Sequence, residues 1–262
     1  LDTPTSDFDL KGIVITPARY FTGFLEHFQQ AEIVTPEVQS SLYNLPRFFE
    51  LAAQCNPNII EMLWSEPLYT TPIGNELMVI RDEFLSKKAR FTFSGYAIAQ
   101  LKRIRTHRKW LLNPPQKQPE RPDFGLPETT LLSADILGTI DAVKDKQGDM
   151  KQFPAHVMEI YTQERAYQNA MTHWRQYTNW KATRNVKRAA MEAAFGYDCK
   201  HAMHLVRLMR MCTEILQGHG VQVLRQDREE LLAIRNGAWS YDQLMAFVDQ
   251  QEAELDTLYA TS

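Results

Sequence analysis

The stretch Thr5-Ser6-Asp7-Phe8-Asp9-Leu10-Lys11-Gly12 decides the fold that we expect for this chain. It leads directly into Ile13-Val14-Ile15, and β-branched residues in this density predict a strand over 10–15. Side chains alternate along a strand, so Asp7 and Asp9 point to the same side. Two carboxylates held side by side repel each other unless a cation lies between them, and their oxygens suit Mg²⁺ or Mn²⁺. The alternative interpretation is a polar strand entry whose acids are solvated.

The composition is that of an ordinary globular protein. Of the 262 residues, 44% are apolar and 23% are charged, and the net charge of -3 gives no overall sign of nucleic-acid binding. No stretch approaches the roughly 18 uninterrupted apolar residues of a membrane helix, and no signal peptide is visible. Three scattered cysteines are too few for a disulfide framework and fit a reducing compartment. We therefore predict a cytoplasmic protein without a membrane segment, and the oligomeric state stays open.

The pattern along the chain predicts an α+β fold. A small mixed β-sheet near the amino end, with a second strand over 39–43, precedes a mainly helical remainder. Three parts are expected: a core with flanking helices over 1–112, a Pro-rich surface loop over 113–129, and a helical domain over 130–262. A short strand is predicted over 221–223. Helices are predicted from Pro46 onward and over 74–85, 93–112, 130–144, 155–179, 185–195, 197–217, 227–235 and 240–259.

A second group of polar residues lies late in the chain. On the helix predicted over 197–217, Lys200, His204 and Arg207 stand at i, i+4 and i+7 and share a face. Such a face could bind a triphosphate or a nucleic-acid backbone, or it could simply be solvated. A neighbouring stripe is predicted to be buried and consists of Ala202, Leu205, Met209 and Cys212. His201 and His204 are spaced as metal ligands, but no nearby acid completes a set, so a zinc site is not favoured.

The predicted helix over 93–112 carries a run of basic residues that ends at Trp110. Basic side chains beside an aromatic ring could hold RNA by phosphate contacts and stacking, although such a run is more often a charged helix surface. The residues of this candidate nucleic-acid site are Arg103, Arg105, His107, Arg108 and Lys109.

These motifs together resemble one family, and the resemblance covers most of the chain. Residues 5–12 resemble the Ser-Asp-x-Asp-x-x-Gly metal motif of the DNA polymerase beta-like nucleotidyltransferases, in the predicted bacterial and phage branch associated with RNA repair. The further motifs that carry it are Cys55-Asn56-Pro57-Asn58-Ile59-Ile60-Glu61, Ser94-Gly95-Tyr96 with Gln100, residues 106–115, residues 197–204 and Glu229-Glu230-Leu231-Leu232-Ala233-Ile234-Arg235.

The resemblance implies a Mg²⁺- or Mn²⁺-dependent transfer of a nucleotidyl group from an NTP to a hydroxyl acceptor, most plausibly RNA. Asp7 and Asp9 would bind the ions and carry catalysis. The residues implied for the nucleotide and its phosphates are Ser6, Lys200, His204 and Arg207. Which NTP and which acceptor are used is not implied.

The sequence departs from the family pattern in two places. Family members carry a Gly-Ser pair a few residues upstream of the acids, and here nothing precedes Leu1; a chain that began at Leu1 would lack this phosphate-binding turn and a core strand. A third carboxylate is expected on a neighbouring strand, where Gln39 aligns best and Glu37 is the available substitute. These departures keep a second hypothesis open, a degenerate relative that binds nucleotide or RNA without turnover. A third is a structural or interaction protein that only shares the fold.

Overall fold

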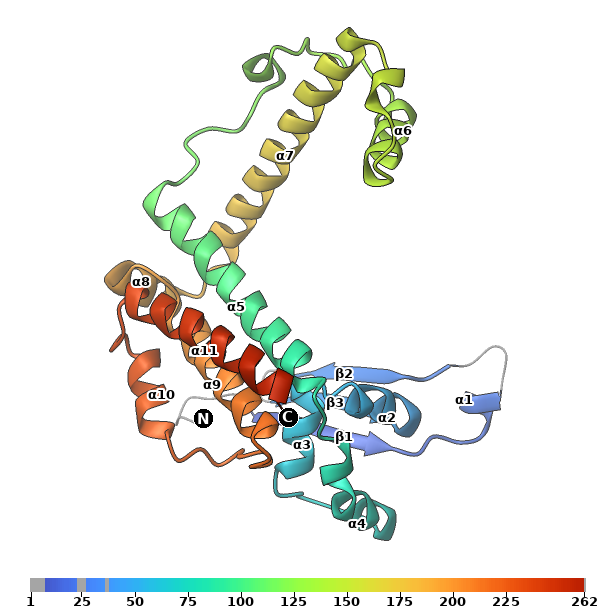
Figure 1. Ribbon diagram of the computed structural model, residues 1–262, viewed down its shortest axis with the longest axis vertical. Helices are drawn as coiled ribbons and strands as arrows, with labels where there is room; N and C mark the ends of the chain where they lie inside the picture. The colour runs from blue at the N-terminus through green and yellow to red at the C-terminus, as the bar shows by residue number, and fades with distance from the viewer. Residues whose placement is uncertain (1–7, 23–26, 36–37, 262) are drawn as a thin grey trace. The chain divides into compact units, whose positions relative to one another are not determined.

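The computed structural model describes residues 8–22, 27–35 and 38–261 and divides into two compact units. The first unit consists of Leu1–Arg108 and Met191–Ser262, and the second consists of Lys109–Ala190. The predicted α+β class is confirmed, because a small three-stranded mixed sheet near the amino end is followed by a mostly helical remainder (Figure 1). Residues 191–262 group with the sheet-bearing part, and the domain borders expected at 112 and 130 stay a prediction.

The sheet has the strand order β1-β3-β2. The central strand β3 (Val38–Asn44) runs parallel to β1 (Phe8–Val14) and antiparallel to β2 (Gln30–Val34). The strands predicted over 10–15 and 39–43 are confirmed as β1 and β3. The sequence reading missed β2, because this edge strand is mostly exposed and lacks an apolar alternation.

Two short helices cover the sheet where its parallel strands end. These are α2 (Leu45–Ala53) and α3 (Pro57–Trp64), and each has a proline in its first turn. The Asn56 side chain accepts a hydrogen bond from the Asn58 N–H at 3.1 Å and so caps α3. Ile13 and Tyr43 of the sheet pack against a buried cluster formed by Phe48, Ala52, Ile59, Leu63 and Leu77.

The largest core is built around α9 (Cys199–Leu216), whose predicted apolar stripe is buried as expected. Residues of α5 (Ala89–Leu112), α10 (Arg228–Arg235) and α11 (Tyr241–Thr261) contribute to the same core. The Asp198 side chain accepts a hydrogen bond from the His201 N–H at 3.0 Å, which caps α9 at its start. All three cysteines are buried thiols.

Two predictions on this part of the chain need correction. The helix predicted over 74–85 is interrupted after α4 (Pro72–Val79) and continues as the 3₁₀ helix η1 (Arg81–Phe84). The strand predicted over 221–223 was wrong, because these residues have no strand pairing and Val221 instead packs into the α9 core. The remaining helices with residues in this unit are α1 (Arg19–Thr22) and α8 (Val186–Phe195).

The second unit contains the expected Pro-rich segment and two helices. The segment is ordered around the 3₁₀ helix η2 (Arg121–Phe124), and α6 (Ala134–Asp145) and α7 (Ala155–Thr183) follow, with η3 (Met150–Gln152) between them. A small core lies between α6 and α7 and consists of Leu132, Leu137, Ile140 and Tyr161. None of the helices in the described ranges combines the length and the apolar character needed to cross a bilayer.

Candidate functional site

Asp9 lies on β1 with an exposed side chain. Within the described ranges, no hydrogen bond or ion pair engages its carboxylate, so its oxygens are accessible to a ligand. Lys11 follows two residues later on the same face, and its Nζ lies 3.5 Å from the Asn58 carbonyl oxygen of α3. Ser6, Asp7 and Glu37, which were also predicted for this site, lie outside the described residues.

The strand register fixes which side chains share a face with Asp9. Gln39 of β3 is its direct partner, which is the position where the family pattern expects a third acid. Ser41 is paired with Lys11 on one side and with Glu32 of β2 on the other, so Glu32 shares this face. Among the described strand residues, Glu32 is the other acid on the face that carries Asp9. The sequence reading missed Glu32 because it missed β2.

The predicted basic face is present on α9. Lys200, His204 and Arg207 are each partly exposed, beside the fully buried stripe of the same helix. Burial, followed by the charges of Arg207 and Lys200, lowers the pKa of His204 to about 3. His204 is therefore a neutral imidazole at physiological pH, and the positive charge of this face comes from its neighbours.

Arg207 connects α9 to α3 through Glu61. Its Nη2 lies 2.9 Å from Glu61 Oε1 and 3.2 Å from Oε2, with 18% and 16% of the two side chains exposed. The Arg207 Nε is buried and has no hydrogen-bond partner within the described chain. Because α3 also contacts Lys11, it is the element that lies next to both the Asp9 face and the basic face of α9.

The basic side chains predicted for nucleic-acid binding separate into two groups. Arg103, Arg105 and Lys109 are exposed on α5. By contrast, Arg108 donates to the Gly196 carbonyl at 2.9 Å and stacks over the Tyr241 ring, 4.3 Å from its centroid. His107 is turned toward Glu192, with 3.8 Å between its Nδ1 and Glu192 Oε1. A role in RNA binding stays a prediction for all five residues.

A family comparison bears on the amino-terminal part of the chain. Residues 1–113 match the model described as RlaP: RNA repair pathway DNA polymerase beta family. This segment is similar to the members of that family. The resemblance to polymerase beta-like proteins of RNA repair is confirmed there, and the match covers less than half of the 262 residues. No curated protein and no solved structure shows significant similarity to the chain.

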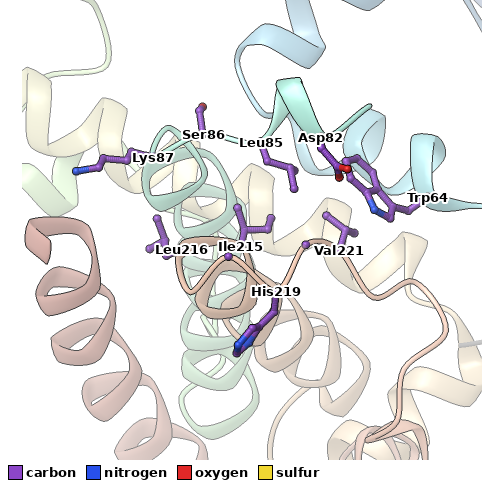
Figure 2. Close-up of a pocket in the computed structure, with 11 residues that line it drawn as sticks. Trp64, Asp82, Leu85, Ser86, Lys87, Ile215, Leu216, His219 and Val221 are labelled. Atoms are coloured by element: carbon purple, nitrogen blue, oxygen red, sulfur yellow. The ribbon is translucent and has the colours of Figure 1, made fainter. Parts of the chain in front are cut away.

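The polymerase beta-like segment also contributes to a cavity away from the predicted site residues. The cavity has a volume of about 580 Å³ and is lined by the end of α3, the turn after η1 and the loop after α9. Trp64 and Asp82 lie together on one side of it and Lys87 on the other, with His219 below them (Figure 2). Among the described residues, none of those predicted for metal, nucleotide or RNA binding lines this cavity.

His204 makes the stability of the protein depend on pH. Its folded-state pKa of about 3 lies below the unfolded value of 6.5. Between these two pH values, His204 is protonated in the unfolded chain and neutral in the folded chain. The free energy of unfolding should therefore fall as the pH drops from 6.5 toward 3, by about 2 kcal/mol at pH 5 from this group. Urea denaturation of the wild type and His204→Gln at pH 7.5 and pH 5 measures this change in the free energy of unfolding. We expect a shallower pH dependence in the variant, and identical slopes would contradict the assignment.

The Arg207–Glu61 pair should couple α9 to α3 energetically. A double-mutant cycle with Arg207→Gln and Glu61→Gln is expected to give a coupling of about 1–3 kcal/mol, because the pair is largely buried and one guanidinium nitrogen contacts both carboxylate oxygens. The exposed pair Arg47–Glu50, also 2.9 Å apart, is the matched control and should give less than about 1 kcal/mol. Equal couplings from the two cycles would show that Arg207 does not join the helices.

Proposed function

We propose that this chain is a divalent-metal-dependent nucleotidyltransferase that transfers a nucleotidyl group from an NTP to a hydroxyl acceptor, with an RNA end as the acceptor class. The observation that carries the proposal is the family match over residues 1–113, in which the Asp-x-Asp acid Asp9 lies exposed on a strand of a mixed sheet. The match to an RNA repair family favours RNA as the acceptor.

The donor chemistry of the proposed site fits Mg²⁺ or Mn²⁺. Asp9 offers carboxylate oxygens that no described residue occupies, and hard oxygen ligands are those that these ions prefer. Asp7, two residues earlier, is proposed as the second acid. When bound, the ions supply charge neutralisation on the triphosphate and activation of the acceptor hydroxyl.

The chain's own residues would orient the nucleotide. Lys200 and Arg207 bring positive charge to one side of α9, and charged donors of this kind suit phosphate oxygens. Neutral His204 would donate or accept a single hydrogen bond at the ribose or a phosphate. Glu61 holds the Arg207 guanidinium in place from α3, so the phosphate contact would be pre-organised.

An assay for nucleotidyl transfer tests the proposal. The full chain is incubated with each labelled NTP, Mg²⁺ or Mn²⁺, and short RNAs with 3′-hydroxyl or 3′-phosphate ends. We expect RNA labelling and pyrophosphate release that require the metal ion and a 3′-hydroxyl. Metal-independent labelling, or pyrophosphate release without any acceptor product, would contradict the proposal.

The second candidate function is binding of nucleotide or RNA without turnover. Gln39 favours it, because a neutral amide stands directly opposite Asp9 where the family pattern expects an acid. Titration calorimetry separates the two candidates. A binding protein would take up nucleotide or RNA with little need for a divalent ion and would release no pyrophosphate, whereas the transferase should bind the triphosphate far more tightly with Mg²⁺ present.

A further inference from the structure

Three side chains with metal-ligand chemistry converge within the first unit, away from the Asp9 face. They are His107 of α5, Glu192 of α8 and Asp198 at the start of α9. A ligand atom from each lies within 4.8 Å of the other two. Glu192 and Asp198 are each only 3% exposed, so this is an interior cluster and not a patch of surface acids.

One separation within the cluster is slightly longer than that between two ligands of the same ion. His107 Nδ1 and Glu192 Oε1 are 3.8 Å apart, which is too long for a hydrogen bond. Two ligand atoms that bind one ion at about 2.0–2.2 Å lie roughly 3.0–3.6 Å from each other. A contraction of about half an ångström would therefore bring His107 Nδ1 and Glu192 Oε1 to the separation of two ligands of one ion.

Asp198 is oriented by contacts that a ligating carboxylate commonly has. Its Oδ1 accepts the His201 backbone N–H at 3.0 Å, and its Oδ2 lies 2.7 Å from His201 Nδ1. Hydrogen bonds of this kind fix ligating carboxylates in metal sites. The His201 ring also lies beside His107, with 6.2 Å between the ring centroids.

The backbone turn between α8 and α9 brings the two acids together. Gly196 has φ +77°, a left-handed conformation that glycine adopts without strain. Arg108 donates to the Gly196 carbonyl at 2.9 Å, and a Cβ at this glycine would lie 2.9 Å from the same guanidinium. The turn is thereby held against α5, one residue from His107.

We propose that His107, Glu192 and Asp198 bind one divalent transition-metal ion, Zn²⁺ or Mn²⁺, in a site separate from the proposed nucleotide site. One imidazole nitrogen and two carboxylate oxygens form a mixed donor set that these ions accept. The ion would lie between two buried carboxylates, and its positive charge would favour their ionised form. It ties α5 and α8 to the start of α9, the helix that carries Lys200, His204 and Arg207.

Metal content and stability of the full chain test this proposal independently of any enzymatic activity. Purified protein is stripped with a chelator, dialysed against Zn²⁺ or Mn²⁺ alone, and analysed by elemental mass spectrometry, equilibrium dialysis and thermal unfolding. We expect about one tightly bound ion per chain and a lower melting temperature after stripping. Glu192→Gln should weaken this binding by more than about 100-fold, the upper end of the cost of losing an outer-shell partner.

Two variants serve as controls. His219→Gln removes an exposed histidine, and Asp9→Asn removes the proposed nucleotide-site ligand; both should keep the tightly bound ion. Should Glu192→Gln fail to fold, the absorption spectrum of the Co²⁺-loaded wild type reports directly on nitrogen and oxygen ligands. A wild type that stays metal-free after dialysis overturns the proposal, as does a Glu192→Gln variant that folds and keeps full affinity.

Discussion

Replacing Asp9 by Asn should lower nucleotidyl transfer by at least about 1,000-fold, or about 4 kcal/mol of transition-state stabilisation. Asparagine keeps the size of the side chain and removes the charge that would hold a divalent ion. Asp9 is exposed on β1, so the folded state should tolerate the change with little loss of stability. Initial rates with labelled NTP and RNA, beside a thermal melt of the same preparation, measure the two effects.

Asp249→Asn provides the matched control, because Asp249 is an exposed acid on α11 with no part in the proposed site. It should leave the rate of transfer unchanged. A folded Asp9→Asn variant that retains a tenth or more of the wild-type rate would remove Asp9 from the catalytic centre. The family assignment of residues 1–113 would then stand without the proposed chemistry.

Replacing Arg121 by Met should destabilise the second unit by about 2–4 kcal/mol. The guanidinium forms a bidentate pair with Glu164 at 2.5 and 3.1 Å, and the Glu164 side chain is 1% exposed. Arg121 also donates to the carbonyls of Pro127 and Thr129 at 2.6 and 3.2 Å. Its removal leaves a buried carboxylate without its cation and releases the Pro-rich segment from α7. Hydrogen exchange of the amides around Glu164 measures the local loss of stability.

The same segment contains a control for this prediction. Lys117 pairs with Asp123 at 2.7 Å, but 69% and 35% of these side chains are exposed. Lys117→Met should therefore change the exchange rates on α7 little or not at all. Equal effects of Arg121→Met and Lys117→Met would show that general loss of charge, and not the buried pair, controls this region. The double replacement Arg121→Met/Glu164→Leu should recover part of the lost stability.

Local sequence signals predicted most of the fold. These signals are the β-branched run after Asp9, the first-turn prolines Pro46 and Pro57, and the apolar stripe of α9. Each depends on neighbouring residues alone, and the structure contains the corresponding strand and helices. The failures came from non-local effects. The edge strand β2 is defined by its pairing with β3, and 221–223 packs into the α9 core without pairing as a strand.

Spacing along one helix also predicted only part of the candidate site. It placed Lys200, His204 and Arg207 on one face, but it could not indicate that Glu61 holds Arg207 or that burial keeps His204 neutral. The cluster of His107 with two acids was not found because its members lie on three helices. Asp198 contacts His201 and caps the same helix, but the group that it forms with Glu192 contains His107 and neither His201 nor His204.

A crystal structure of the full chain with Mn²⁺ and a non-hydrolysable NTP analogue would show whether Asp9 binds the metal ion beside the nucleotide. We expect anomalous density for Mn²⁺ about 2.0–2.3 Å from an Asp9 carboxylate oxygen, with triphosphate oxygens in contact with Lys200 or Arg207. A nucleotide bound elsewhere, for example in the cavity between Trp64 and His219, with no ion at Asp9, would contradict it (Figure 2).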